Sequence, residues 1–113
     1  MKPIIIKSDK FLNSISWFFE VGGITLFPFI IVRPNVSKST LNHESIHIAQ
    51  YSELFVIGFL LMYLWDWVKG LIKYKDPKVA YEKIRFEQEA YEYTRNFKYL
   101  SNRKRFAWRK YKV

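Results

Sequence analysis

The chain has 113 residues, no cysteine, 50% hydrophobic and 19% aromatic residues, and a formal net charge of +9. This composition excludes a disordered chain, a disulfide framework and thiolate metal ligands. The length allows one domain, residues 1–113, with a single core and no separate substrate domain.

The amino terminus carries a short apolar run, Ile4-Ile5-Ile6, between Pro3 and Lys7. The run is too short for a signal peptide and has no small-residue cleavage site. We therefore expect no export by that route and a cytoplasmic or membrane-associated protein.

Two β-prone runs, residues 15–21 and 24–33, flank a Gly-Gly pair and predict an N-terminal β-hairpin. Pro28 cannot donate a ladder hydrogen bond, so the second strand should be an edge strand or carry a bulge there. Such an edge is where a peptide can add itself by strand pairing. The competing prediction is a short helix, because a helical period also fits Phe11, Leu12, Ile15, Phe18 and Phe19.

The segment that follows contains the motif HExxH, formed by His43, Glu44 and His47, and these are the only two histidines in the chain. Residues four apart share a helix face, so both imidazoles can bind one zinc ion. Glu44 lies beside them and can act as general base toward a metal-activated water. The alternative is a solvated helix face with two polar histidines. We expect Ser39 or Thr40 to cap this helix.

Directly after the motif helix, the stretch Leu54 to Trp65 has twelve residues without a charge and is apolar on every face. Twelve residues of helix cover about 18 Å, short of the roughly 30 Å bilayer core. Such a helix must be hidden. Burial in the core, an oligomer contact and partial membrane insertion are the three possibilities, the last with an interfacial belt of Trp65, Trp67, Lys69, Lys73 and Lys75.

Asp76-Pro77 predicts the start of another helix, which we expect to continue to about Asn96. A catalytic zinc site needs a third protein ligand. This helix offers four carboxylates, Glu82, Glu87, Glu89 and Glu92. Glu87 shares a face with apolar neighbours, which favours it as the inward ligand, and Glu89 stays the alternative.

HExxH followed by Glu87-Gln88-Glu89-Ala90 resembles the gluzincin branch of zinc metallopeptidases, with the Glu-x-x-Ala of a downstream helix. From about residue 24 to residue 96 the chain also resembles small HExxH proteins of bacteria and phages, through the motifs Asn-His-Glu-x-Ile-His and Phe-Glu-x-Glu-Ala-Tyr. The resemblance implies a zincin-like α+β fold, mainly α, with His43, His47 and Glu87 as Zn²⁺ ligands. Tyr91 stands where related proteases have an aspartate. Tyr91 or Arg33 is a candidate oxyanion donor or support for a ligand.

The basic residues concentrate in a C-terminal tail, residues 93–113, where eight basic residues and no acidic residue follow Glu92. We expect a last short helix there, from Ser101 or Asn102 to Lys110. Such a tail suits an anionic membrane surface or an acidic partner. No RNA-binding motif or helix-turn-helix pattern is present, so nucleic acid is not an expected partner.

Two functions are therefore open. The first is a minimal zinc metallopeptidase that acts on a peptide or protein. The second is a non-catalytic zinc-binding or structural module, associated with a membrane or a phage particle (virion). The position of Glu44 favours the enzyme, because a structural zinc site needs no general base.

Overall fold

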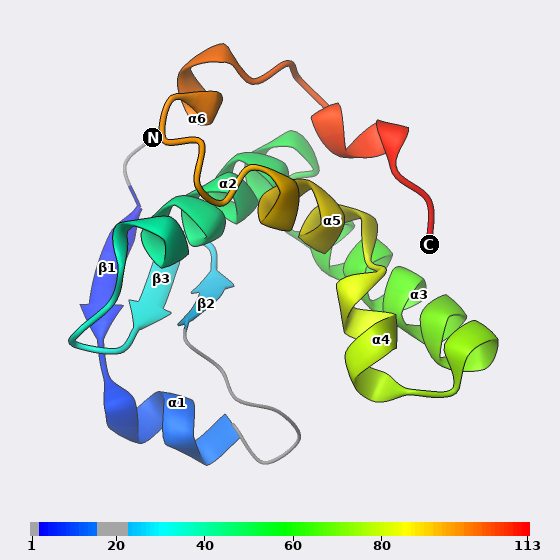
Figure 1. The fold of residues 1–113 in the computed structure, drawn as a ribbon, viewed down its shortest axis with the longest axis horizontal. Helices are drawn as coiled ribbons and strands as arrows, with labels where there is room; N and C mark the ends of the chain where they lie inside the picture. Colours follow the sequence, from blue (N-terminus) through cyan, green and yellow to red (C-terminus); the bar gives the residue numbers. More distant parts are fainter. Residues whose placement is uncertain (1–2, 16–22) are drawn as a thin grey trace.

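The computed structural model describes residues 3–15 and 23–113. Figure 1 shows the strands and α1 at one end of the molecule, α3 and α4 at the other, and α2 beside α5 between them. The elements in chain order are β1 (Ile4–Lys7), α1 (Asp9–Ile15), β2 (Gly23–Leu26), β3 (Phe29–Val32), α2 (Lys38–Glu53), α3 (Ile57–Tyr74), α4 (Pro77–Glu82), α5 (Arg85–Glu92), α6 (Tyr99–Asn102) and the 3-10 helix η1 (Ala107–Lys110). A mainly helical fold with a small sheet is thus confirmed.

The sheet has the strand order β1-β3-β2, with β1 parallel and β2 antiparallel to β3. The hairpin lies between β2 and β3, with its turn at Phe27 and Pro28. The predicted single strand over 24–33 is therefore wrong, because Phe27 and Pro28 form a turn within it, although the carbonyl of Pro28 still accepts a hydrogen bond from Ile4 of β1 at 2.9 Å. The predicted first strand began at Ile15, which ends α1, and its remainder lies outside the described residues.

α1 agrees in part with the competing helix prediction. Phe11, Leu12 and Ile15 all fall in this helix, and Leu12 is fully buried. The last two residues of that pattern lie outside the described part of the chain.

The motif helix is present as α2. Its N-cap is Ser37, whose hydroxyl accepts a hydrogen bond from the backbone N–H of Thr40 at 3.2 Å, so the prediction of Ser39 or Thr40 as the cap is wrong. α2 ends at Glu53, because Phe55 and Val56 both have a positive φ, which no right-handed helix contains. The chain direction changes by 114° between α2 and α3.

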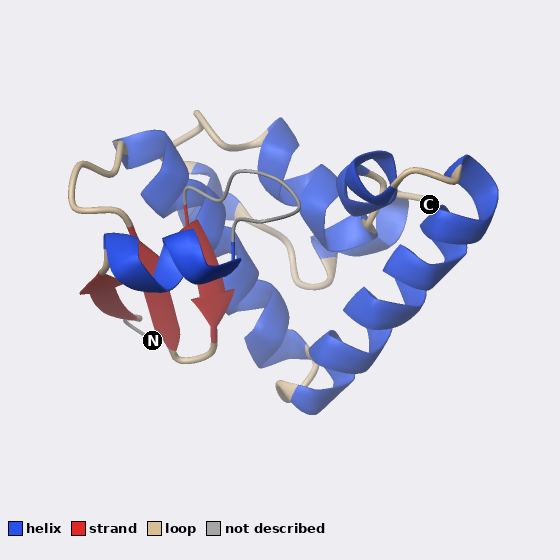
Figure 2. Cartoon of the chain, turned by 90° about the horizontal axis from the view of Figure 1, so that it is seen from below, coloured by secondary structure: helices blue, strands red, loops and turns tan. Residues whose placement is uncertain are grey.

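α3 is buried on one face only. Its buried residues are Phe59, Asp66 and Gly70, and the rest of the helix is partly or largely exposed. Gly70 lies inside the helix against Ala80 of α4. Figure 2 shows α3 along the outer edge of the molecule. No single helix in the described ranges is long and apolar enough to cross a membrane, although α2 and α3 taken together pass that test.

Asp76 is the N-cap of α4 and Pro77 its first residue, as predicted. The predicted continuation to Asn96 is wrong, because the chain turns at Ile84, whose side chain is fully buried, and restarts as α5. The turn directs the backbone N–H and guanidinium of Arg85 to the buried carboxylate of Asp66, with the shortest N–O distance 2.9 Å. The buried carboxylate thus accepts the hydrogen bond that the backbone N–H of Arg85 would donate within a continuous helix.

The C-terminal segment differs from the predicted single helix. α6 and η1 are two short turns of helix, and Trp108 of η1 is buried against Phe86 of α5. Arg103, between them, has only 5% of its side chain exposed and bonds to the carboxylates of Glu53 and Glu89. Part of the basic tail therefore belongs to the core of the protein.

Candidate metal centre

α2 presents the motif side chains toward α5 and β2. Within the described residues, His43, Glu44 and His47 form a buried cluster in which one possible ligand atom of each lies within 4.8 Å of the others. This is the arrangement that the spacing of four residues on a helix predicts.

Glu87 joins this cluster from α5. Its Oε1 lies 3.1 Å from Nε2 of His43 and 3.1 Å from Nε2 of His47. Two ligands at about 2.0–2.1 Å from a tetrahedral zinc are roughly 3.3 Å apart. Two imidazole nitrogens and one carboxylate oxygen are also the donor types of a catalytic zinc site. The residues present therefore fit a zinc ion.

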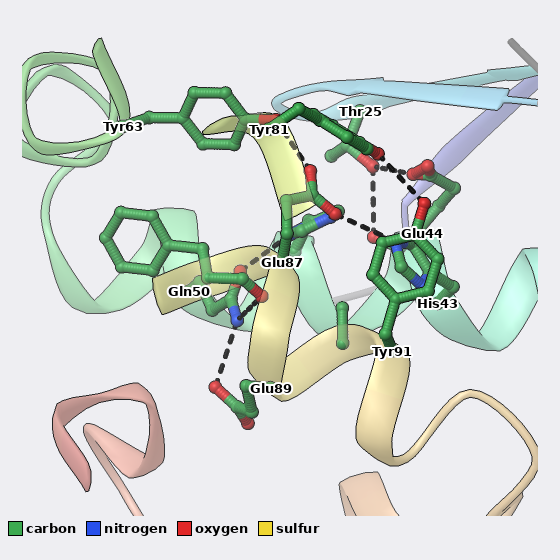
Figure 3. A network of polar contacts seen from close by, with 12 residues as sticks. Thr25, His43, Glu44, Gln50, Tyr63, Tyr81, Glu87, Glu89 and Tyr91 are labelled. Atoms are coloured by element: carbon green, nitrogen blue, oxygen red, sulfur yellow. Dashed lines mark hydrogen bonds and ion pairs between the residues drawn. The ribbon is translucent and has the colours of Figure 1, made fainter. Parts of the chain in front are cut away.

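Glu89 does not reach the histidines. It points to the other side of α5 from Glu87 (Figure 3), where its carboxylate accepts hydrogen bonds from Gln50, Tyr99 and Arg103. The geometry thus separates the two candidates for third ligand. Glu87 lies at the histidines, whereas Glu89 accepts a hydrogen bond from Gln50 of α2 on the other side of α5.

The tautomer of His43 follows from its neighbour Thr94. The hydroxyl of Thr94 donates to the carbonyl of Ala90 at 2.7 Å, so toward His43 it can only accept. Nδ1 of His43, 3.0 Å away, therefore carries the proton and donates it. Nε2 is left to face Glu87.

His47 is oriented in the same way by Gln50. The amide nitrogen of Gln50 donates to the carbonyl of Phe86 at 3.0 Å and to Glu89 at 2.9 Å, which leaves its oxygen as the acceptor. Nδ1 of His47 lies 2.7 Å from that oxygen and donates to it. Both imidazoles therefore direct Nε2 to the same point, as a metal site requires.

The fourth residue, Glu44, is held by β2. The hydroxyl of Thr25 lies 3.1 Å from Oε2 of Glu44 and 3.1 Å from its carbonyl oxygen. The hydroxyl of Tyr51 in turn donates to the carbonyl of Thr25 at 2.9 Å and ties the strand to α2. The base candidate thus has a fixed orientation beside the histidines.

The electrostatics of the cluster suit a cation. Burial raises the pKa of a carboxyl, but the charge of His47 and its hydrogen bond hold the pKa of Glu87 well below its usual range. Burial also disfavours an imidazolium, yet Glu87 raises the pKa of His47 to about 9. Burial raises the pKa of Glu44 despite the opposing charges of His47 and His43. In the metal-free protein, a proton on His47 thus supplies the positive charge that balances the buried carboxylate of Glu87.

A cleft of about 1150 Å³ opens at the cluster. Aromatic side chains line much of it, among them Phe59, Tyr63, Trp67, Tyr81 and Tyr91. The residues of β2 form another wall, and within the described chain β2 has β3 as its sole neighbour in the sheet. The side chains of His43, Glu44, His47 and Glu87 therefore line this cleft.

The two oxyanion candidates have different positions. The ring of Tyr91 lies 4.4 Å from that of His43, centroid to centroid, and its hydroxyl is 3.3 Å from the hydroxyl of Tyr81. Arg33 does not line the cleft, and its guanidinium bonds to Asp9 and Asn13 of α1. The structure brings Tyr91 to the site and leaves Arg33 outside it.

Sequence reasoning missed four residues that contact the cluster, which are Thr25, Gln50, Tyr63 and Thr94. Tyr63 donates to Oε2 of Glu87 at 2.6 Å. Only Gln50 had a local signal, because a residue three positions after His47 lies on the same face of the helix. The other three reach the site through the hairpin, the bend before α3 and the end of α5.

We compared the chain with protein-family models, curated protein sequences and solved structures, and none of the three comparisons found a match.

Proposed function

We propose that this protein is a zinc-dependent peptidase, in which His43, His47 and Glu87 hold the metal and Glu44 is the general base. The observation that carries the proposal is the position of Glu87. Its Oε1 lies 3.1 Å from Nε2 of His43 and 3.1 Å from Nε2 of His47. Two histidines of one helix and a glutamate of a later helix are the set implied by the resemblance to gluzincins. No such set arises from a solvated helix face, because all three side chains are buried.

Zinc at such a site supplies Lewis acidity and makes a nearby water more acidic. Glu44 accepts the proton of the attacking water, and Thr25 orients the carboxylate for this transfer. Burial raises the pKa of Glu44, which brings a carboxylate closer to the pKa of an effective base near neutral pH. Tyr91, at the cleft beside His43, is the proposed donor to the oxyanion.

The cleft favours a peptide with large apolar side chains. Its walls are rich in aromatic rings, which bury apolar surface, and β2 offers backbone groups for strand pairing. The carbonyl of Thr25 already accepts from Tyr51, so pairing has to use the other backbone groups of β2.

The first test is metal content. Mass spectrometry of the native protein should find close to one zinc per chain, and His43→Ala, His47→Ala or Glu87→Ala should each lose most of it. The matched control is Glu82→Ala, which removes an exposed glutamate of α4. Full zinc in Glu87→Ala would disprove the ligand assignment.

The second test is turnover on a peptide library. Glu44→Gln should keep its zinc and lose a factor of about 10² to 10⁴ in rate, because the proton acceptor is gone. Chelated wild type should be inactive and recover with zinc. If wild type holds zinc but cleaves nothing, the non-catalytic zinc module becomes the better interpretation.

A further inference from the structure

The outer face of α3 is apolar along its whole length. The residues that form this stripe follow a helical spacing of three or four, and they are Ile57, Leu61, Leu64, Trp65, Val68 and Ile72. All but Val68 are largely exposed, with Ile57 70%, Leu61 64% and Ile72 73% accessible. They lie opposite the face that packs into the protein through Phe59 and Gly70. An apolar stripe of this length on a free surface marks an interaction site.

The turn before α3 carries one more exposed apolar side chain. Phe55 is 86% exposed, the most accessible of the large apolar side chains described. The positive φ of Phe55 and Val56 produces the sharp turn between α2 and α3, with Phe55 at its tip. An aromatic side chain that is already exposed can bury its ring in lipid without rearrangement of the fold.

The charges on α3 indicate what covers the stripe. Lys69 and Lys73 are its exposed charged residues, and they form one row beside Trp65 and Ile72. Its one acid, Asp66, is fully buried and paired with Arg85 at 2.9 Å. The exposed surface of α3 is therefore apolar with a cationic margin and carries no carboxylate.

A second copy of this chain suits that surface poorly. In a symmetric pair the same patch meets itself, and in the antiparallel arrangement both lysine rows then lie on the same side of the contact. Each copy also has a net charge of +9, so association works against the repulsion of the two chains. An anionic bilayer supplies hydrocarbon for the stripe and phosphate for Lys69, whereas Lys73 already donates to the carbonyl of Val113 at 3.4 Å. Trp65, at the border of the stripe and the lysines, is the residue type that occupies the membrane interface.

We propose that the outer face of α3, with Phe55, docks on the surface of an anionic phospholipid bilayer. α3 lies along the surface, because only one of its faces is free and the opposite face is packed on the protein. This proposal does not depend on the peptidase function, and its test needs no metal.

The test is sedimentation of the full chain with vesicles of phosphatidylcholine alone and with vesicles that also contain phosphatidylglycerol. Wild type should bind the anionic vesicles and bind them less as salt is added. Leu61→Glu should weaken binding by about tenfold or more, because the stripe no longer enters the apolar layer. Ile4→Glu is the matched control, since it places the same charge at an exposed apolar residue of β1, at the other end of the molecule from α3 (Figure 1), and should bind as wild type does.

Thermal unfolding of both variants checks that each is folded. A second readout needs no charged variant. Brominated lipid should quench the emission of wild type, and Trp65→Phe should lose the quenched component while it still sediments with the vesicles. Failure of wild type to bind anionic vesicles would overturn the proposal, as would equal losses in Leu61→Glu and Ile4→Glu. A wild-type dimer that Leu61→Glu turns into monomers, with no vesicle binding, would assign the face to a second copy instead.

Discussion

Gln50 and His47 are joined by a hydrogen bond of 2.7 Å that sets the direction of the proposed metal ligand. Gln50 is fully buried, and its other amide atom is used by Phe86 and Glu89 of α5. One side chain therefore orients an imidazole of α2 and fastens α2 to the helix that carries Glu87.

Replacement of Gln50 by leucine should weaken zinc binding while the three ligands stay in the chain. The change leaves Nδ1 of His47 without an acceptor, and loss of such a partner costs about 10- to 100-fold in metal affinity. Competition with a chromogenic chelator measures the affinity. Ser52→Ala, at an exposed position of the same helix, should leave it unchanged. Equal affinities in the two variants would show that Gln50 does not orient the ligand.

The proton on His47 predicts a pH dependence for the metal-free protein. Glu87 raises the folded-state pKa of His47 to about 9, above the unfolded value near 6.5. The protonated His47 therefore adds to the free energy of unfolding in full below about pH 6.5, and this contribution is lost as the pH rises through 9. The melting temperature of the chelated protein should fall between pH 7 and 9.5. His47→Gln lacks the titrating group and should show a smaller fall.

With zinc bound, His47 has no proton to lose over this range, so the melting temperature should change less with pH than that of the chelated protein. Parallel curves for the zinc-loaded and chelated samples would mean that His47 is not the group displaced by the metal.

The local part of the site could be predicted from the sequence. The histidine pair follows from helix periodicity, and Asp76-Pro77 marks a helix start through capping chemistry that acts within one turn. Glu87 stood out because a carboxylate among apolar neighbours needs a partner. These signals all lie within one or two turns of the residue concerned.

The breaks in the helices had no such signal. Val56 is β-branched and disfavours the positive φ that it adopts, so no propensity rule marks the end of α2. Ile84 interrupts the next helix because a buried carboxylate, Asp66, takes the N–H of Arg85. The sequence placed Arg103 in the basic tail, because its partners, Glu53 and Glu89, lie far from it in the chain. Tertiary contacts decide all three.

The contact between α3 and α4 predicts opposite effects for two glycines of α3. A Cβ on Gly70 would lie 2.9 Å from Cα of Ala80, so Gly70→Ala should force the helices apart and cost about 1–3 kcal/mol of unfolding free energy. A Cβ on Gly58 would meet only the side chain of Leu54, at 3.3 Å. Gly58→Ala should therefore be neutral or gain up to about 1 kcal/mol from helix propensity. Urea denaturation measures both, and a stabilised Gly70→Ala would contradict the close packing.

The C-terminal segment should prove essential for stability through Arg103. Its guanidinium lies 2.9 Å from the carboxylate of Glu53 and also bonds to Glu89, and all three side chains are less than 10% exposed. Arg103→Met would leave two buried carboxylates without their cation, at a cost of about 3–5 kcal/mol in unfolding free energy. Lys104→Met, at the exposed next position, should change it by less than about 0.5 kcal/mol. Urea denaturation at neutral pH compares the two variants. Similar small losses in both would mean that the segment after α5 contributes only surface charge.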